Sequence, residues 1–223
     1  MKYKILMTFF FSLVLLLAKE ISSDDEYIID TTHSSVQFGI KHLSVADTIG
    51  VFQDFEGQLF FRENKILKLR GSVQISSINT FNPARDEDLQ NDEFFQEKVA
   101  ILESFSFKND ILFTKLTMNG ITKEVSFKTT IAGPLRNPSL SMTTKENTHP
   151  LIPTTPMQNI LNNPLFTQDS NIDCGCYMSY GENVLGIVLE GKINRFDFHI
   201  SPKTPKQLLG EFVDIKIIIE ASK

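Results

Sequence analysis

Four histidines and two cysteines are the side chains best suited to acid–base, metal or redox chemistry in this chain. His33 and His42 lie in one stretch, and Asp30 and Ser34 flank the first of them, so a hydrolytic constellation can be imagined. The intervening residues would span roughly 30 Å as a strand, so the two histidines meet only if the chain folds back. The sequence holds no Gly-x-Ser-x-Gly nucleophile elbow and no recognisable setting for a Cys nucleophile. We therefore expect no catalytic residues, and interpret each His as a polar anchor at a strand end or turn.

Cys174 and Cys176 are separated by a single residue. A disulfide between such close neighbours closes a very small, strained ring. A metal site needs further ligands, and no His lies nearby in the sequence. We expect an incidental thiol pair in a loop, with no metal and no cofactor; a redox or metal role is the alternative.

The segments that must position these side chains alternate apolar and polar residues with a period of two. The clearest runs are 36–41, 72–76, 104–108, 125–131 and 213–220. Each predicts a strand with one dry and one wet face, which is typical of antiparallel sheet. Turn signals such as Asn109-Asp110 and Asn119-Gly120 separate the runs, and 111–131 is expected to form a hairpin. Many strands of this kind must pair their edges, so the pattern predicts an all-β barrel or sandwich.

Helix is scarce in the pattern. The best candidate is 86–102, because acidic residues open it, although Leu89 and Phe94-Phe95 also fit short turns. A brief turn is expected at 44–48. The segment 137–179 carries five prolines and no strand alternation, so we expect a long insertion with one short helix at 157–161.

The N-terminus has the order of a secretory signal peptide. Lys2 and Lys4 precede an apolar run, 5–18, which is shorter than the roughly 20 residues that span a bilayer. We expect residues 1–23 to be a signal peptide, residues 24–223 to form one domain, and the location to be periplasmic or secreted. An uncleaved membrane anchor is the alternative. The net charge of −5, without a basic block, argues against nucleic acid and anionic membrane as main partners.

A series of short motifs occurs in order along the chain, and together they resemble the signature of the YceI-like family. They are Tyr27-x-Ile29-Asp30-x-x-His33-Ser34-x-Val36-x-Phe38-x-Ile40-Lys41-His42-Leu43, Gly50-x-Phe52-x-x-Phe55-x-Gly57, Arg85-Asp86-x-x-Leu89 with Phe94-Phe95, Gly120-Ile121-Thr122-Lys123-Glu124-Val125, and Ile193-Asn194-Arg195-Phe196-Asp197-Phe198. His199 stands where the family usually has Gly, and segment 137–179 is longer than the family pattern.

This resemblance implies an exported, lipocalin-like barrel of about eight antiparallel strands, with a binding rather than a catalytic role. Its interior tunnel would hold a polyisoprenoid, such as the tail of a polyprenyl quinone, for storage or transport. The expected partner is therefore a long-chain isoprenoid lipid or quinone and no nucleic acid. Transient membrane contact for ligand exchange and a homodimer are further expectations.

The chain has 19 Phe and no Trp, which fits either a Phe-rich core or a Phe-lined cavity. The candidate residues of the apolar tunnel, for each of which ordinary core packing is the alternative, are Phe38, Ile40, Phe52, Phe55, Phe105, Phe107, Phe113 and Phe127.

The candidates for a polar mouth or a structural role are His33, His42, Arg85, Asp86 and Arg195. Arg85 and Asp86 either meet a ligand head group or fix the adjoining loop as an ion pair or helix cap. Arg195 in a barrel strand needs a carboxylate partner or a wet mouth, and Asp86 is a candidate partner.

Two other functions remain open. An enzyme acting on a small molecule in the same barrel would need His33 or His42 to face the cavity beside a carboxylate or Ser. An interaction protein would work through the 137–179 insertion.

Overall fold

The computed structural model describes residues 20–137 and 181–223. The strands in these ranges are β1 (Glu26–Ile29), β2 (Ser35–His42), β3 (Ala46–Phe52), β4 (Phe55–Arg62), β5 (Lys65–Gln74), β6 (Ile78–Asn79), β7 (Val99–Lys108), β8 (Ile111–Met118), β9 (Ile121–Arg136), β10 (Asn183–Asn194) and β11 (Leu209–Ser222). They are accompanied by one α-helix, α2 (Pro83–Leu89), and by the 3₁₀ turns η1 (Ser23–Asp25), η2 (Ile75–Ser77) and η4 (Arg195–Phe198).

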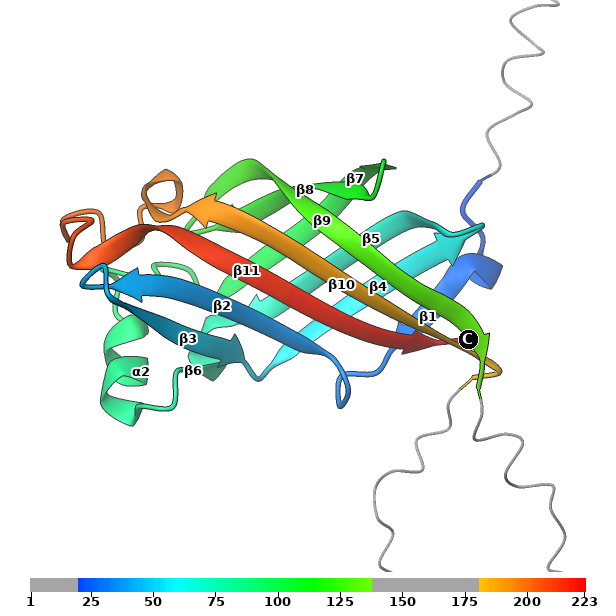
Figure 1. Cartoon of the computed structure of the whole chain (residues 1–223), viewed down its shortest axis with the longest axis horizontal. Coiled ribbons are helices and arrows are strands. Elements are labelled where there is room, and N and C mark those ends of the chain that lie inside the picture. The colour runs from blue at the N-terminus through cyan, green and yellow to red at the C-terminus, as the bar shows by residue number, and fades with distance from the viewer. Residues whose placement is uncertain (1–19, 138–180) are drawn as a thin grey trace, which may run out of the picture.

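The strands form a closed antiparallel barrel (Figure 1). Neighbours follow the order β1-β4-β5-β7-β8-β9-β10-β11, and β1 closes the ring of eight because it pairs with both β4 and β11. Strands β2, β3 and β6 extend the wall beyond β11 at the end of the barrel where α2 lies (Figure 1). The strands predicted from the alternating sequence pattern therefore form a closed barrel and not a sandwich.

Tight turns connect the strands as the sequence predicted. Asn109-Asp110 joins β7 to β8 and Asn119-Gly120 joins β8 to β9, each with positive φ at both residues. Asn, Asp and Gly tolerate this left-handed backbone, and its twist matches that of the flanking strands. The predicted 111–131 hairpin is confirmed by the β8–β9 register.

The helix predicted over 86–102 is wrong in its bounds. Helix α2 begins at Pro83, because the Asn82 side chain accepts a hydrogen bond from Arg85 N–H and a proline suits the first turn. It ends at Leu89, and residues from Val99 onward belong to β7. The turn expected at 44–48 is also displaced, since β3 already begins at Ala46.

Aromatic and aliphatic side chains of β1 and β4 pack together inside the barrel. Tyr27 and Phe61 meet edge to face there, with ring centroids 5.8 Å apart, and Leu59 is completely buried. Burial raises the pKa of Tyr27.

None of the helices in the described ranges is long and apolar enough to cross a membrane. The expected signal peptide (up to residue 19), the body of the insertion with its helix, Cys174 and Cys176 lie outside these ranges.

Candidate functional site

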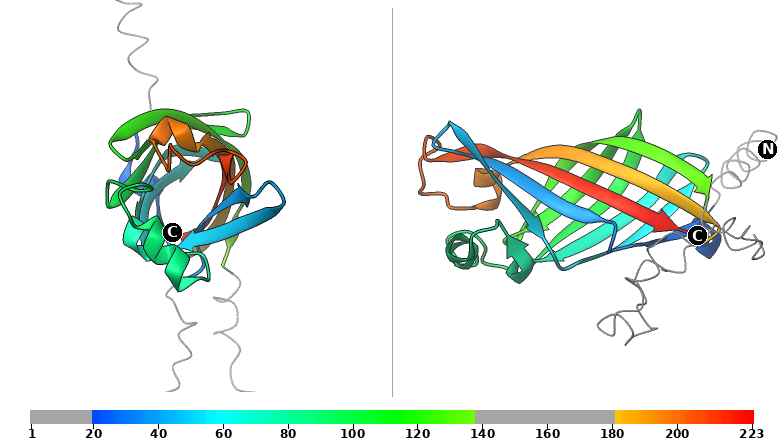
Figure 2. Two further views of the ribbon diagram at one scale, coloured as in Figure 1. Left: turned by 90° about the vertical axis from the view of Figure 1, so that its left-hand side faces the viewer. Right: turned by 60° about the horizontal axis from the view of Figure 1, so that its bottom comes forward.

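An apolar cavity occupies the barrel interior towards the α2 end. Its volume is about 180 Å³. Its wall reaches from Leu89, Phe94 and Ile200 at the α2 end to Ile29 at the end of β1 and Ile219 near the end of β11. Figure 2 shows the ring of strands from the α2 end, with α2 beside the lumen and not across it. The arrangement can hold an elongated apolar molecule along the barrel axis.

Most of the predicted tunnel residues lie on this wall. Those that line the cavity are Phe38, Ile40, Phe52, Phe55 and Phe127. The rings of Phe38 and Phe52, from paired strands, lie 5.5 Å apart between centroids. A Cβ built on Gly50 would lie only 2.3 Å from Phe38 Cζ, so the motif glycine is required where this ring crosses β3.

Three predicted residues do not line the cavity: Phe105, Phe107 and Phe113. Strand β8 turns its even-numbered residues inward, so Phe113 faces outward and lies 6.3 Å from the ring of Phe105. Ala100 and Leu102 of β7 are buried, so regular alternation puts Phe105 on the outer face, where it is exposed. A β-bulge between Ser104 and Ser106 then interrupts the alternation. Phe107 is partly buried and packs against the core. The two-residue period of the sequence predicted that Phe105 and Phe107 lie on one face of the strand, but the bulge puts them on different faces.

The largest contribution that sequence reasoning missed comes from β11. Val213, Ile215, Ile217 and Ile219 all line the cavity. Their alternation was visible in the sequence as a strand signal, but phenylalanines were favoured as lining residues. The same bias left out Leu89, Phe94 and Phe95, which reach the cavity from the end of α2 and the segment after it, although they belong to a recognised motif.

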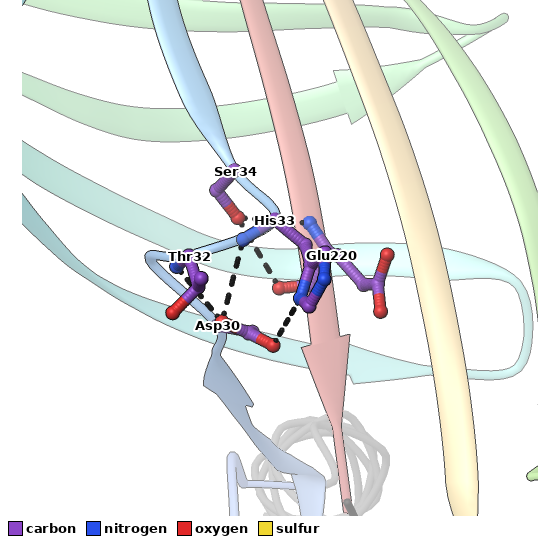
Figure 3. A network of polar contacts seen from close by, with 5 residues as sticks. All are labelled: Asp30, Thr32, His33, Ser34 and Glu220. Carbon is purple, nitrogen blue, oxygen red and sulfur yellow. Dashed lines mark hydrogen bonds and ion pairs between the residues drawn. The ribbon is translucent and has the colours of Figure 1, made fainter. Parts of the chain in front are cut away.

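Asp30 and His33 shape the turn between β1 and β2 (Figure 3). Asp30 Oδ1 accepts the Thr32 N–H at 2.8 Å, and Oδ2 lies 2.8 Å from His33 Nδ1. The hydrogen bond to Asp30 raises the pKa of His33, with smaller contributions from the charges of Asp30 and Glu220 against some desolvation. Ser34 Oγ and the Glu220 backbone tie the turn to β11. The cluster therefore anchors two neighbouring strands.

Asp30, His33 and Glu220 are also the group in the described residues whose ligand atoms approach closely enough to hold a metal, within 4.8 Å of one another. Both Asp30 carboxylate oxygens already take part in the hydrogen bonds of the turn. His42 is exposed at the other end of β2, so the two histidines stay apart. Neither lines the cavity.

Arg85 and Asp86 bind the same residue, Thr80, and not each other. Arg85 donates from Nε to Thr80 Oγ1 and from Nη2 to Thr80 O, both at 2.7 Å. Asp86 Oδ1 accepts from Thr80 N–H at 2.8 Å and from its hydroxyl at 2.6 Å. Together they fix the loop that leads from β6 into α2.

Arg195 has no carboxylate partner among the described residues, so the expectation of an Asp86 pair is wrong. Its side chain is completely buried and donates to the backbone carbonyls of Ile200, Ser201, Thr204, Leu209 and Gly210. Burial lowers the pKa of Arg195, while the charge of Glu211 partly opposes this effect. The guanidinium organises the 200–210 segment, because these carbonyls would otherwise lack donors inside the protein.

Asn119 joins this segment to the one after α2. Its side-chain amide donates to the carbonyls of Phe94 and Phe198, and its Oδ1 accepts from Gln96 N–H. The Phe94 and Ile200 side of the cavity is therefore held by a network of hydrogen bonds.

Comparison with known proteins gives one consistent result. The profile described as the YceI-like domain matches residues 27–221. A UPF0312 protein of Staphylococcus aureus is 35% identical over 120 residues, covering 50% of this chain and 68% of that protein. A UPF0312 protein of Shewanella denitrificans is 30% identical over 136 residues, covering 56% of this chain and 71% of its own length.

Among solved structures, the Campylobacter jejuni YCEI protein superposes with a TM-score of 0.60 at 22% identity, covering 82% of this chain and 90% of that one. Burkholderia cenocepacia BcnA gives a TM-score of 0.60 at 14% identity, covering 87% and 99%. These likenesses concern the fold.

Proposed function

This chain belongs to the YceI-like family, and from that premise we propose that it binds a polyisoprenoid chain in the barrel interior, as a carrier or store. The observation that carries the proposal is the continuous apolar wall from α2 to β1 and β11. A prenyl chain, such as a quinone tail, presents only carbon and hydrogen to such a wall. Each buried CH₂ contributes roughly 0.8 kcal/mol, so several isoprene units can bind tightly after ordering costs are subtracted.

Binding is favoured over catalysis by what surrounds the cavity. No His or Cys of the described residues lines it, and the Glu56 carboxylate at its border accepts a hydrogen bond from Ser72 Oγ at 3.1 Å. His33 is engaged with Asp30 in the turn between β1 and β2, and Arg195 is engaged with backbone carbonyls. A carrier needs a dry space and few polar groups, whereas an enzyme needs a positioned acid, base or nucleophile.

The proposed location is outside the cytoplasm, because the first 23 residues have the order of a signal peptide. A polyisoprenoid has very low solubility in water, so loading and unloading would occur in brief contact with a membrane or another carrier.

The test is extraction of the protein, purified without detergent from its own host, with organic solvent, followed by mass spectrometry. We expect a polyisoprenoid or polyprenyl quinone in an amount comparable to the protein. Absence of lipid from repeated native preparations, together with no uptake of quinone analogues, would overturn the proposal.

A further inference from the structure

Exposed apolar side chains gather at the α2 end of the barrel. We call Leu43, Val45, Ile49, Phe81 and Leu208 the apolar rim. Val45 is 83% exposed and Phe81 is 77% exposed. Leu43 and Val45 lie in the β2–β3 turn, and Leu208 immediately precedes β11. This end of the molecule faces the viewer in the left view of Figure 2.

The β2–β3 turn is chemically unlike the other turns of its type in the described residues. Leu43 and Ser44 have φ values of 51° and 59°, and Val45 N–H donates to His42 O, as in a type I′ turn. The other pairs with two positive φ values are Glu63-Asn64, Asn109-Asp110 and Asn119-Gly120, which are polar or Gly-containing. A leucine in this backbone is strained, and its exposure shows that packing within the protein does not offset that cost.

Phe81 also combines a positive φ with an exposed apolar side chain. Its φ is 63°, an unusual value for a bulky residue, and its ring is largely in solvent. It lies near Ile49, because Val51 pairs with Asn79 in the antiparallel β3–β6 ladder and a Cβ built on the preceding residue, Gly50, would lie 2.9 Å from Thr80 Cγ2. Two strained, exposed apolar residues at one end of a barrel indicate a surface selected for contact, not for folding.

The apolar rim borders the cavity. Leu43 N–H donates to Leu208 O at 3.0 Å, and the next residue, Leu209, lines the cavity. Lys203 and Lys206 lie in the segment that carries Leu208. Lys206 is 3.9 Å from Glu211, and no ion pair within the described residues involves Lys203. Helix α2, which carries acidic residues, begins two residues after Phe81 and lies across this end of the barrel from the segment that carries Leu208 (Figure 2).

We infer that the apolar rim inserts into a bilayer carrying anionic lipids, with Lys203 and Lys206 at the head groups and the cavity opening towards the acyl chains. This inference rests on the proposed function and adds the surface through which the isoprenoid is exchanged. The negative net charge of the chain keeps the contact weak, so the protein can leave the bilayer after exchange.

The test uses the double variant Leu43→Asn/Phe81→Asn. Asn tolerates positive φ, so the variant should fold as well as the wild type or better. The matched control is Ile28→Asn/Leu135→Asn, which removes two exposed apolar side chains at the other end of the barrel. All proteins are mixed with phosphatidylcholine vesicles containing phosphatidylglycerol. Sedimentation measures how much protein binds to the vesicles, and fluorescence measures the transfer rate of a labelled geranylgeraniol.

We expect vesicle binding by the rim variant to fall about tenfold for each side chain withdrawn from the bilayer, and transfer to slow in parallel. Affinity for geranylgeraniol delivered from detergent should stay unchanged, as should both properties of the control. An equal loss of vesicle binding in the control, or no loss of vesicle binding in the rim variant, would overturn the inference. Loss of self-association in place of vesicle binding would also overturn it, and would assign the rim to a second copy of the chain. If no variant binds geranylgeraniol while vesicle binding still depends on the rim, the proposed function fails and not the docking surface.

Discussion

Filling the cavity from its wall tests the binding account directly. Ala100 is buried in β7 and lines the cavity, so the substitution Ala100→Phe places a ring where the ligand would lie. The ring displaces about six ligand carbons, worth at most about 5 kcal/mol at 0.8 kcal/mol each. We therefore expect the Kd for a labelled geranylgeraniol, measured by fluorescence titration, to rise by up to a few thousandfold.

The control for this variant is Ala132→Phe. Ala132 is exposed on β9, so the same ring there leaves the cavity unchanged. Thermal unfolding should show that Ala100→Phe remains folded, because its ring occupies existing space. An unchanged Kd in folded Ala100→Phe, or an equal rise in Ala132→Phe, would refute binding in the barrel interior.

Three further predictions concern the scaffold around the cavity. Arg195→Met should lower the free energy of unfolding by at least about 3 kcal/mol in urea titrations, because it leaves several backbone carbonyls without their donor. The raised pKa of His33 means that its pairing with Asp30 contributes fully below the ordinary pKa of 6.5 and is lost as the pH rises through the folded pKa. The Tm difference between wild type and His33→Asn should therefore be larger at about pH 5.5 than at about pH 8; a constant difference would contradict this. Phe127→Ala should cost about 3–5 kcal/mol and Phe105→Ala less than about 0.5 kcal/mol; similar costs would contradict the inward position of Phe127 and the outward position of Phe105.

The barrel was predictable because its strands are regular. Alternation in 36–41, 125–131 and 213–220 matches β2, β9 and β11, and Asn-Asp and Asn-Gly pairs mark the turns between β7, β8 and β9. Closure depends on β1, a short strand that pairs on both edges, and local periodicity carries no information about such distant pairing.

Features that depend on single residues were harder to predict. A bulge places Phe107 on a different face of β7 from Phe105 without a Gly or Pro to mark it. Arg195 finds carbonyl partners in a loop, whereas sequence reasoning favoured a carboxylate. His199 has a φ of 54°, which explains why Gly suits this position in the family pattern. The sequence shows that His stands in place of the usual Gly, but only the backbone conformation shows why Gly is usual at this position.

Native mass spectrometry of the intact protein is the most direct test of the central claim. We expect the wild type, loaded with a polyisoprenoid, to carry one ligand per chain, and Ala100→Phe to carry none under the same conditions. A wild type that acquires no ligand mass, or an Ala100→Phe variant that retains it in full, would contradict the account.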